Sequence, residues 1–393
     1  MRKLLLLITV LCLLLTSCTV REINTEETKD TTEETTTEET DIVEETLEKM
    51  SLEEKVGQLF MLTPEGLLGA MEDAQLNSTN GEAVTAMTDG LKNAMQKYAP
   101  GGIILYYNNI LDENQIKEYT SALHNASDLP LLIGIDEEGG RVARIGNNEN
   151  FSVTSFGSME AVGASENTDE AYNAGRTIGA YLHEYGFDLD FAPVADINSN
   201  PENRVIGDRA FGSDALLVSS MVNAFAAGLQ DEGVYGCVKH FPGHGDTAGD
   251  THEGFVKVDK TWDELFGNEI IPFVSAIKND IPFVMAAHVA CPEITGDNTP
   301  ASMSYTLLTE KLRNELGFKG IIITDGMNMG AVTQNYSSAE AAVKAVNAGV
   351  DMILCPYDFF DAYNGIIDAV NSGSISIERI DESVSRILNI KLK

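Results

Sequence analysis

The sequence predicts an α/β fold, a single (β/α)8 barrel of the TIM type, preceded by a disordered acidic tether. Three observations support this prediction. Short apolar runs recur along the chain beyond residue 47, segments with helical periodicity separate these runs, and polar residues follow several of them. Near-continuous apolar runs are typical of parallel strands that are buried on both faces of a sheet.

Residues 1–18 have the composition of a bacterial signal peptide. A basic start and a Leu-rich run too short to span a bilayer are followed by Leu15-Thr16-Ser17-Cys18. This ending resembles a lipobox, in which the Cys becomes the lipidated N-terminus. We therefore expect lipidation at Cys18 and an extracytoplasmic protein anchored to the bacterial cell membrane. The alternative is an ordinary signal peptide in which the Cys has no role.

Residues 19–46 consist largely of Thr and Glu. Such a composition cannot bury a core, so we expect a disordered linker that holds the following domain away from the membrane. The domain itself is expected to cover residues 47–393.

The formal net charge of the chain is −35. This excess of acidic residues argues against a nucleic-acid partner, because binding to phosphates requires a basic surface. We expect a monomer that contacts the membrane through its lipid anchor alone.

Eight apolar runs are the expected strands of the barrel. They are 58–62, 102–106, 131–136, 188–193, 236–240, 283–288, 321–325 and 352–356. Among the segments between them, 215–229 has apolar residues on or near one face: Leu216, Val218, Met221, Val222, Phe225 and Leu229. Gly349 and Ser376 are expected helix caps. A doubly wound open sheet remains the alternative arrangement.

Three cysteines of the expected domain, Cys237, Cys291 and Cys355, stand singly in or beside apolar runs. We expect them to be small buried hydrophobic residues, because their spacing suggests neither a zinc site nor a set of disulfides.

Polar residues gather where the predicted strands end. They are Asp136, Asp196, His240, His288 and Asp325. The carboxyl ends of the strands form the face on which barrel enzymes carry their active sites, whereas a barrel with a purely structural role would not need polar residues there.

Asp325 ends an apolar run and is followed by Gly326, which allows a turn. A carboxylate in this position could serve as an ionised nucleophile or as a ligand. It could instead simply cap the next helix.

The segment from Lys239 to His252 contains three His, two Asp and three Gly after an apolar run. Asp250 could orient His252 for proton transfer near neutral pH, and Lys239 and His240 could donate to substrate hydroxyls. A zinc site is the rival interpretation, with a possible ligand set of His240, His244, Asp250 and His252.

Two further segments carry candidate binding residues. Asp136 precedes Glu137-Glu138-Gly139-Gly140-Arg141-Val142-Ala143-Arg144 and could accept hydrogen bonds from two adjacent sugar hydroxyls. Arg204 and Arg209 lie in another loop after a predicted strand.

Together these motifs resemble the family 3 glycoside hydrolases, and within them the single-domain β-N-acetylglucosaminidase (β-N-acetylhexosaminidase) branch. The resemblance covers about residues 48–360. It rests on a matching start at 50–60 and on the motifs that contain Asp136, Lys239 and Asp250, which occur in the order of the family.

The resemblance implies a retaining, metal-free and cofactor-free exo-glycosidase. Its substrate would be terminal β-linked N-acetylglucosamine (GlcNAc), with peptidoglycan fragments as the expected source. Asp325 would be the nucleophile, and His252 with Asp250 the acid/base. The sugar-binding residues would be Asp136, Arg144, Arg209, Lys239 and His240.

Two other functions remain open at this point: a metal-dependent hydrolase, and a lipoprotein that binds sugars without turnover. The family often has Gln at the position of Glu137. We expect this difference to change only local hydrogen bonding.

Overall fold

The computed structural model of the chain describes residues 42–69, 83–247, 249, 251, 254 and 256–392. The expected signal peptide, Cys18 and most of the expected linker lie outside the described residues, as do Asp250 and His252. Residues 42–49 are helical, so regular structure begins earlier than residue 47. Val43 and Leu47, four residues apart on one face of this helix, pack against the core and explain the difference.

Eight strands form the central sheet, which confirms the predicted barrel. In spatial order they are β11 (Ile321–Thr324), β9 (Phe283–Ala286), β7 (Tyr235–Phe241), β6 (Leu189–Asp190), β3 (Leu132–Ile135), β2 (Gly102–Ile104), β1 (Phe60–Leu62) and β12 (Ile353–Leu354). All neighbouring pairs in this order are parallel. A parallel bridge between Ile323 and Met352 joins β11 to β12 and closes the ring. The alternative of an open doubly wound sheet is therefore wrong.

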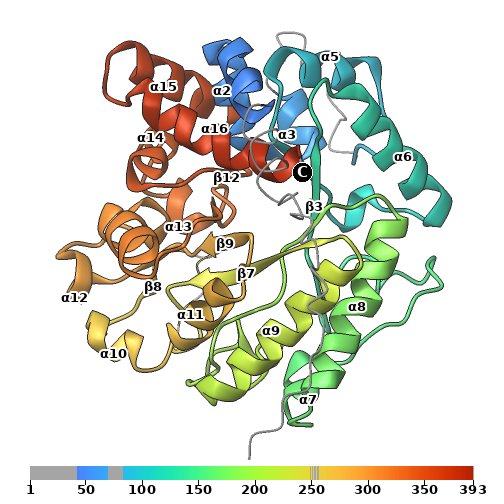
Figure 1. The fold of residues 1–393 in the computed structure, drawn as a ribbon, viewed down its shortest axis with the longest axis vertical. Coiled ribbons are helices and arrows are strands. Elements are labelled where there is room, and N and C mark those ends of the chain that lie inside the picture. The colour runs from blue at the N-terminus through green and yellow to red at the C-terminus, as the bar shows by residue number, and fades with distance from the viewer. Residues whose placement is uncertain are drawn as a thin grey trace, which may run out of the picture. The chain divides into compact units, whose positions relative to one another are not determined.

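Helices surround the strands in chain order (Figure 1). Before β3 they are α2 (Leu52–Gln58), α3 (Pro64–Leu68), α5 (Asp89–Tyr98) and α6 (Glu113–Ala126). Between β3 and β9 they are α7 (Met159–Gly163), α8 (Thr168–Glu184), α9 (Ala215–Asp231), α10 (Trp262–Phe266) and α11 (Ile271–Lys278). The later ones are α12 (Pro292–Thr295), η4 (Thr306–Glu315), α13 (Gly330–Thr333), α14 (Ser338–Ala348), α15 (Phe359–Asn371) and α16 (Ile377–Lys391).

The chain also forms short elements outside the central sheet. The two small sheets are the antiparallel pair β4 (Glu137–Gly139) and β5 (Val142–Ala143), and the parallel pair β8 (Val256–Lys257) and β10 (Val289–Ala290). Three short 3-10 helices are η1 (Tyr107–Asn109), η2 (Gly207–Arg209) and η3 (Ala301–Met303).

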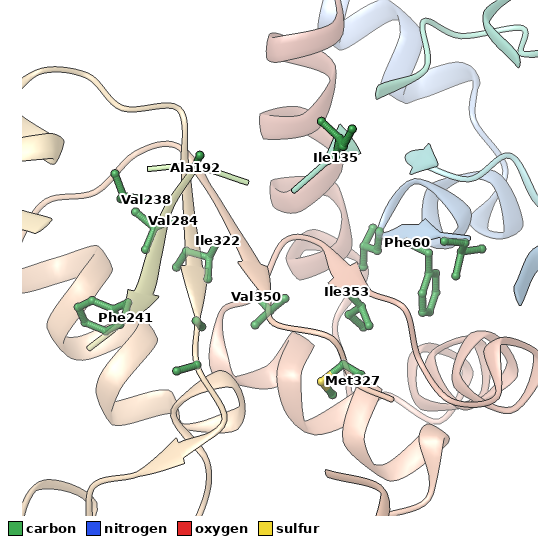
Figure 2. Close-up of a cluster of buried hydrophobic side chains, with 14 of the residues drawn as sticks. Phe60, Ile135, Ala192, Val238, Phe241, Val284, Ile322, Met327, Val350 and Ile353 are labelled. Atoms are coloured by element: carbon green, nitrogen blue, oxygen red, sulfur yellow. The ribbon is translucent and has the colours of Figure 1, made fainter. Parts of the chain in front are cut away.

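The core has two layers because side chains alternate along each strand. On β12, Ile353 packs outward against the helices and Leu354 points into the barrel. The outer layer is a continuous cluster between strands and helices, part of which Figure 2 shows. The inner layer includes a residue from every barrel strand: Met61, Ile104, Leu132, Leu189, Cys237, Phe283, Ile323 and Leu354 among others.

Several local predictions are confirmed. Ser376 caps α16, and Gly349, with φ 112°, ends α14. Cys237, Cys291 and Cys355 are buried, unpaired thiols. Leu216 was wrongly assigned to the apolar face of α9, since it is 69% exposed in the first turn. Within the described residues, no helix has both the length and the apolar composition needed to cross a bilayer.

Candidate active site

A cavity of about 350 Å³ opens at the carboxyl ends of the strands. Six of the eight predicted catalytic and binding residues line it: Asp136, Arg144, Arg209, Lys239, His240 and Asp325. The other two, Asp250 and His252, are outside the described residues, but Thr251 between them also lines the cavity. A larger hollow of about 480 Å³ beside α14 and α15 contains none of the predicted residues.

Lys239 lies near the centre of this site, on β7, and is only 2% exposed. Its Nζ atom is 2.8 Å from Asp136 Oδ1 and 2.6 Å from Glu138 Oε1. Burial alone would favour the neutral amine, but the two carboxylates outweigh it and raise the pKa of Lys239 above its ordinary value. The ammonium group is therefore a fixed positive charge and a fixed hydrogen-bond donor.

Glu138 is a site residue that the sequence did not single out. Its two carboxylate oxygens accept hydrogen bonds of 2.7 Å from Nε and Nη2 of Arg209. Burial alone would raise the pKa of Glu138, but Arg209 and Lys239 lower it well below its ordinary value. Glu138 thus binds both cations and fixes their positions. The sequence could have indicated this position for Glu138, because residues two apart on an extended chain, such as Asp136 and Glu138, point to the same side.

Arg144 reaches the cavity from the turn after β5. Its Nη2 atom lies 3.2 Å from Asp136 Oδ2, and its guanidinium lies over the ring of Tyr106 at 5.6 Å. Asp136 therefore accepts from Lys239 with one oxygen and from Arg144 with the other. These contacts fix the carboxylate at the wall of the cavity.

Asp196 determines the orientation of His240. Its Oδ2 atom lies 2.6 Å from His240 Nδ1, and its Oδ1 atom accepts a 2.6 Å hydrogen bond from the amide of His244. On the other side of the ring, Arg209 Nη2 is 3.4 Å from His240 Nε2. A carboxylate at Nδ1 and a guanidinium donor at Nε2 favour the tautomer with its proton on Nδ1. The sequence placed Asp196 at a strand end but gave it no role.

Asp325 follows β11 directly and receives a 2.7 Å hydrogen bond at Oδ1 from the amide of Gly326. Burial alone would raise the pKa of its carboxyl. The nearby His240 and His288 rings, the Gly326 amide and Lys239 outweigh this effect and hold the pKa below its ordinary value. Asp325 is therefore an ionised carboxylate inside the cavity.

His288, the remaining polar residue predicted at a strand end, is fully buried and supports the turn beside Asp325. Its Nε2 atom lies 3.0 Å from the carbonyl oxygen of Gly326, and its Nδ1 atom lies 2.8 Å from Ser302 Oγ. Arg204, also considered from sequence, contributes its carbonyl oxygen to Arg141, at 2.8 Å from Nη2.

The segment after β7 is held by His244. Its Nδ1 atom is 2.7 Å from Thr247 Oγ1, and its Nε2 atom is 3.4 Å from Thr251 Oγ1. The carbonyl oxygen of Thr251 also accepts from the amide of Ala331 at 3.1 Å. Among the described residues, no group of three His, Cys, Asp or Glu is placed to hold a metal ion; two members of the predicted zinc set, Asp250 and His252, are not among them.

Comparisons with known proteins identify the family of the chain. The pattern described as the Glycosyl hydrolase family 3 N terminal domain matches residues 51–390. The chain belongs to glycosyl hydrolase family 3. Within this family, Beta-hexosaminidase A of Pseudoalteromonas piscicida is 34% identical over 336 residues, which are 79% of this chain and 56% of that protein. Beta-hexosaminidase of Idiomarina loihiensis is 36% identical over 277 residues, which are 69% of this chain and 81% of that protein.

Among solved family 3 structures, a beta-N-acetylglucosaminidase from Paenibacillus sp. str. FPU-7 is similar with a TM-score of 0.79 and 37% identity. The similarity covers 87% of this chain and 62% of that chain. The present chain thus spans less than two thirds of the length of this protein.

Proposed function

We propose that the protein is a retaining exo-β-N-acetylglucosaminidase that removes terminal β-linked GlcNAc, with peptidoglycan fragments as its source of substrate. The observation that carries this proposal is the ionised Asp325 carboxylate inside a cavity whose walls hold fixed cations and carboxylates. The names of the relatives, Beta-hexosaminidase and beta-N-acetylglucosaminidase, support the choice of sugar.

The substrate is proposed to be held by its hydroxyl groups. Lys239, Arg144 and Arg209 donate hydrogen bonds, and Asp136 accepts them. Because these side chains already bind one another at fixed distances, little ordering is needed when the sugar enters. A cavity of about 350 Å³ suits one terminal sugar ring and not an extended chain, which favours exo action.

In the first chemical step, an Asp325 oxygen attacks the anomeric carbon and the glycosidic carbon–oxygen bond breaks. His252, oriented by Asp250, gives its proton to the departing oxygen, and a glycosyl ester forms on Asp325. In the second step, His252 takes a proton from water, whose oxygen attacks the anomeric carbon and releases Asp325. Most retaining glycosidases use two carboxylates, whereas here a His takes the second role.

The experiment compares hydrolysis of p-nitrophenyl β-GlcNAc and p-nitrophenyl β-glucoside in the presence of EDTA, for the wild type and Asp325→Ala. We expect strong preference for the GlcNAc substrate, no effect of EDTA, and loss of nearly all turnover in the variant. Activity that disappears with EDTA and returns with zinc would favour the metal-dependent hydrolase. Sugar binding without turnover would favour the binding lipoprotein.

We further propose that the protein is anchored outside the cytoplasm through a lipid on Cys18, and that it works as a monomer. The lipobox-like ending at residues 15–18 supports the anchor. Detergent-phase partitioning of the full chain and of Cys18→Ala tests it. Equal partitioning of the two proteins would contradict the proposal.

A further inference from the structure

Glu137 is a buried residue that does not line the cavity. The two oxygens of its side chain accept four hydrogen bonds. Oε2 accepts from the amides of Arg144 and Ile145, at 2.6 and 2.9 Å. Oε1 accepts from the amide of Gly146 at 2.7 Å and from the Tyr181 hydroxyl at 2.8 Å. One carboxylate thus gathers three successive main-chain amides of the turn that carries Arg144.

The main chain of Glu137 is fixed as well. Its amide donates a 2.9 Å hydrogen bond to Asp190 Oδ1 on strand β6 of the barrel. The turn at 144–146 is therefore attached through Glu137 to the barrel wall. The side chain of Arg144 then extends from this turn to Asp136, which also binds Lys239.

We propose that Glu137 is a positioning residue for substrate binding, which acts by fixing the main chain at 144–146 so that Arg144 meets Asp136 in the cavity. This inference rests on the proposed function, because it takes Arg144 as a residue that binds the sugar.

The number of acceptors distinguishes Glu from Gln at this position of the chain. Three amide N–H groups can only donate, and the two carboxylate oxygens accept from all of them and from the Tyr181 hydroxyl. In a Gln side chain, an NH₂ group replaces one oxygen. It would face either the amides of Arg144 and Ile145 or the amide of Gly146, so at least one buried N–H would lose its acceptor.

The resemblance to the family led us to expect that Glu in place of Gln alters only local hydrogen bonding. The geometry points to a larger consequence in this chain, because the altered bonds belong to the segment that presents Arg144. A shift of this segment moves a guanidinium away from Asp136. It leaves Asp325 in place, because Asp325 follows β11, which is four strands away from β3 in the order around the barrel.

A double-mutant cycle tests this role. The variants are Glu137→Gln, Arg144→Ala and the two together, and Tyr181→Phe is the control, because it removes one donor and leaves the three amide bonds intact. KM and kcat for p-nitrophenyl β-GlcNAc are measured for each variant.

We expect Glu137→Gln to raise KM by about tenfold with kcat within about threefold of the wild type, since a lost buried bond is worth roughly 1.4 kcal/mol. Tyr181→Phe should change KM by less than about twofold.

The decisive comparison is the Arg144→Ala background, in which Glu137→Gln should raise KM no further. A tenfold rise in both backgrounds, or no rise in the wild-type background, overturns the inference. Where Glu137→Gln does not fold, Glu137→Asp, which keeps both oxygens but shortens the side chain, takes its place. If the wild type shows no turnover, the proposed function fails. The Kd of GlcNAc is then measured for the same variants, and the outcomes stated above for KM apply to Kd.

Discussion

The Oδ2 atom of Asp196 lies 2.6 Å from Nδ1 of His240, so a fully buried carboxylate determines which ring nitrogen faces the cavity. The same carboxylate accepts from the amide of His244. The burial of Asp196 would raise its pKa, but His240 and His244 lower it below its ordinary value, and the group remains ionised.

Asp196→Asn should therefore lower kcat/KM. The amide offers one acceptor oxygen in place of two, and it cannot serve both His240 Nδ1–H and the His244 amide. A buried donor without a partner costs roughly 1–3 kcal/mol, which corresponds to about a 5- to 150-fold loss. Steady-state kinetics on p-nitrophenyl β-GlcNAc measure this loss. Asp231→Asn, at an exposed carboxylate bonded to Tyr172, is the matched control. Equal rates for the two variants would exclude a role for Asp196.

Glu138→Gln should destabilise the fold strongly. The change removes the negative charge that Lys239 and Arg209 share in a buried site, and an uncompensated buried charge costs about 3–5 kcal/mol. Urea unfolding at neutral pH measures the free energy of unfolding. The control is Glu232→Gln, which removes a carboxylate 2.9 Å from the exposed Arg176 and should leave the unfolding midpoint nearly unchanged. Similar midpoints for both variants would show that Glu138 does not stabilise the cation pair.

Gly245→Ala should displace the segment after β7. A Cβ atom at this position would lie 1.8 Å from the carbonyl oxygen of Ile197, so the backbone has to move. Because this segment leads to Thr251 at the cavity, we expect kcat/KM to fall by about tenfold or more. Gly157→Ala is the control, since a Cβ there would meet nothing within 4 Å. Wild-type kinetics in Gly245→Ala would contradict the packing argument.

Lys391→Met should stabilise the protein at neutral pH. Lys391 is buried, and its Nζ atom donates to Gln58 Oε1 at 2.7 Å. Burial lowers the pKa of Lys391 to about 7, whereas an unfolded lysine has a pKa of about 10.4. Between these values the unfolded chain binds more protons, so stability rises with pH across this window. From these two pKa values, removing the amine should add about 4 kcal/mol at pH 7 and less than about 1 kcal/mol at pH 10. Thermal unfolding of both proteins at pH 7 and pH 10 measures the gain in stability. An equal gain at the two pH values would contradict the assignment of the effect to the buried amine.

Much of the barrel could be predicted because the strands lie in short apolar runs, several of which are followed by a polar residue. Each of the eight predicted runs overlaps a strand, from β1 at Phe60–Leu62 to β12 at Ile353–Leu354. The exposure of Leu216 could not be predicted, because helical periodicity does not show where the neighbouring layer ends.

The site was harder to predict than the fold. Residues with a strand-end position, such as Asp136, Lys239 and Asp325, were predicted from the sequence, and they line the cavity. Glu138 and Asp196 act through other side chains, and their partners are far away in sequence: Arg209 is 71 residues from Glu138, and His240 is 44 residues from Asp196. A single sequence carries no direct signal of such pairs.

Trapping of the glycosyl-enzyme tests the central claim most directly. The full chain is incubated with a GlcNAc fluoride that carries an additional fluorine at ring carbon 5, and peptides are analysed by mass spectrometry. Our account predicts that one fluorinated GlcNAc accumulates on the peptide containing Asp325 as activity is lost, and that Asp325→Ala acquires no label. A label on another residue, or normal turnover by Asp325→Ala, would contradict the assignment of Asp325 as the nucleophile.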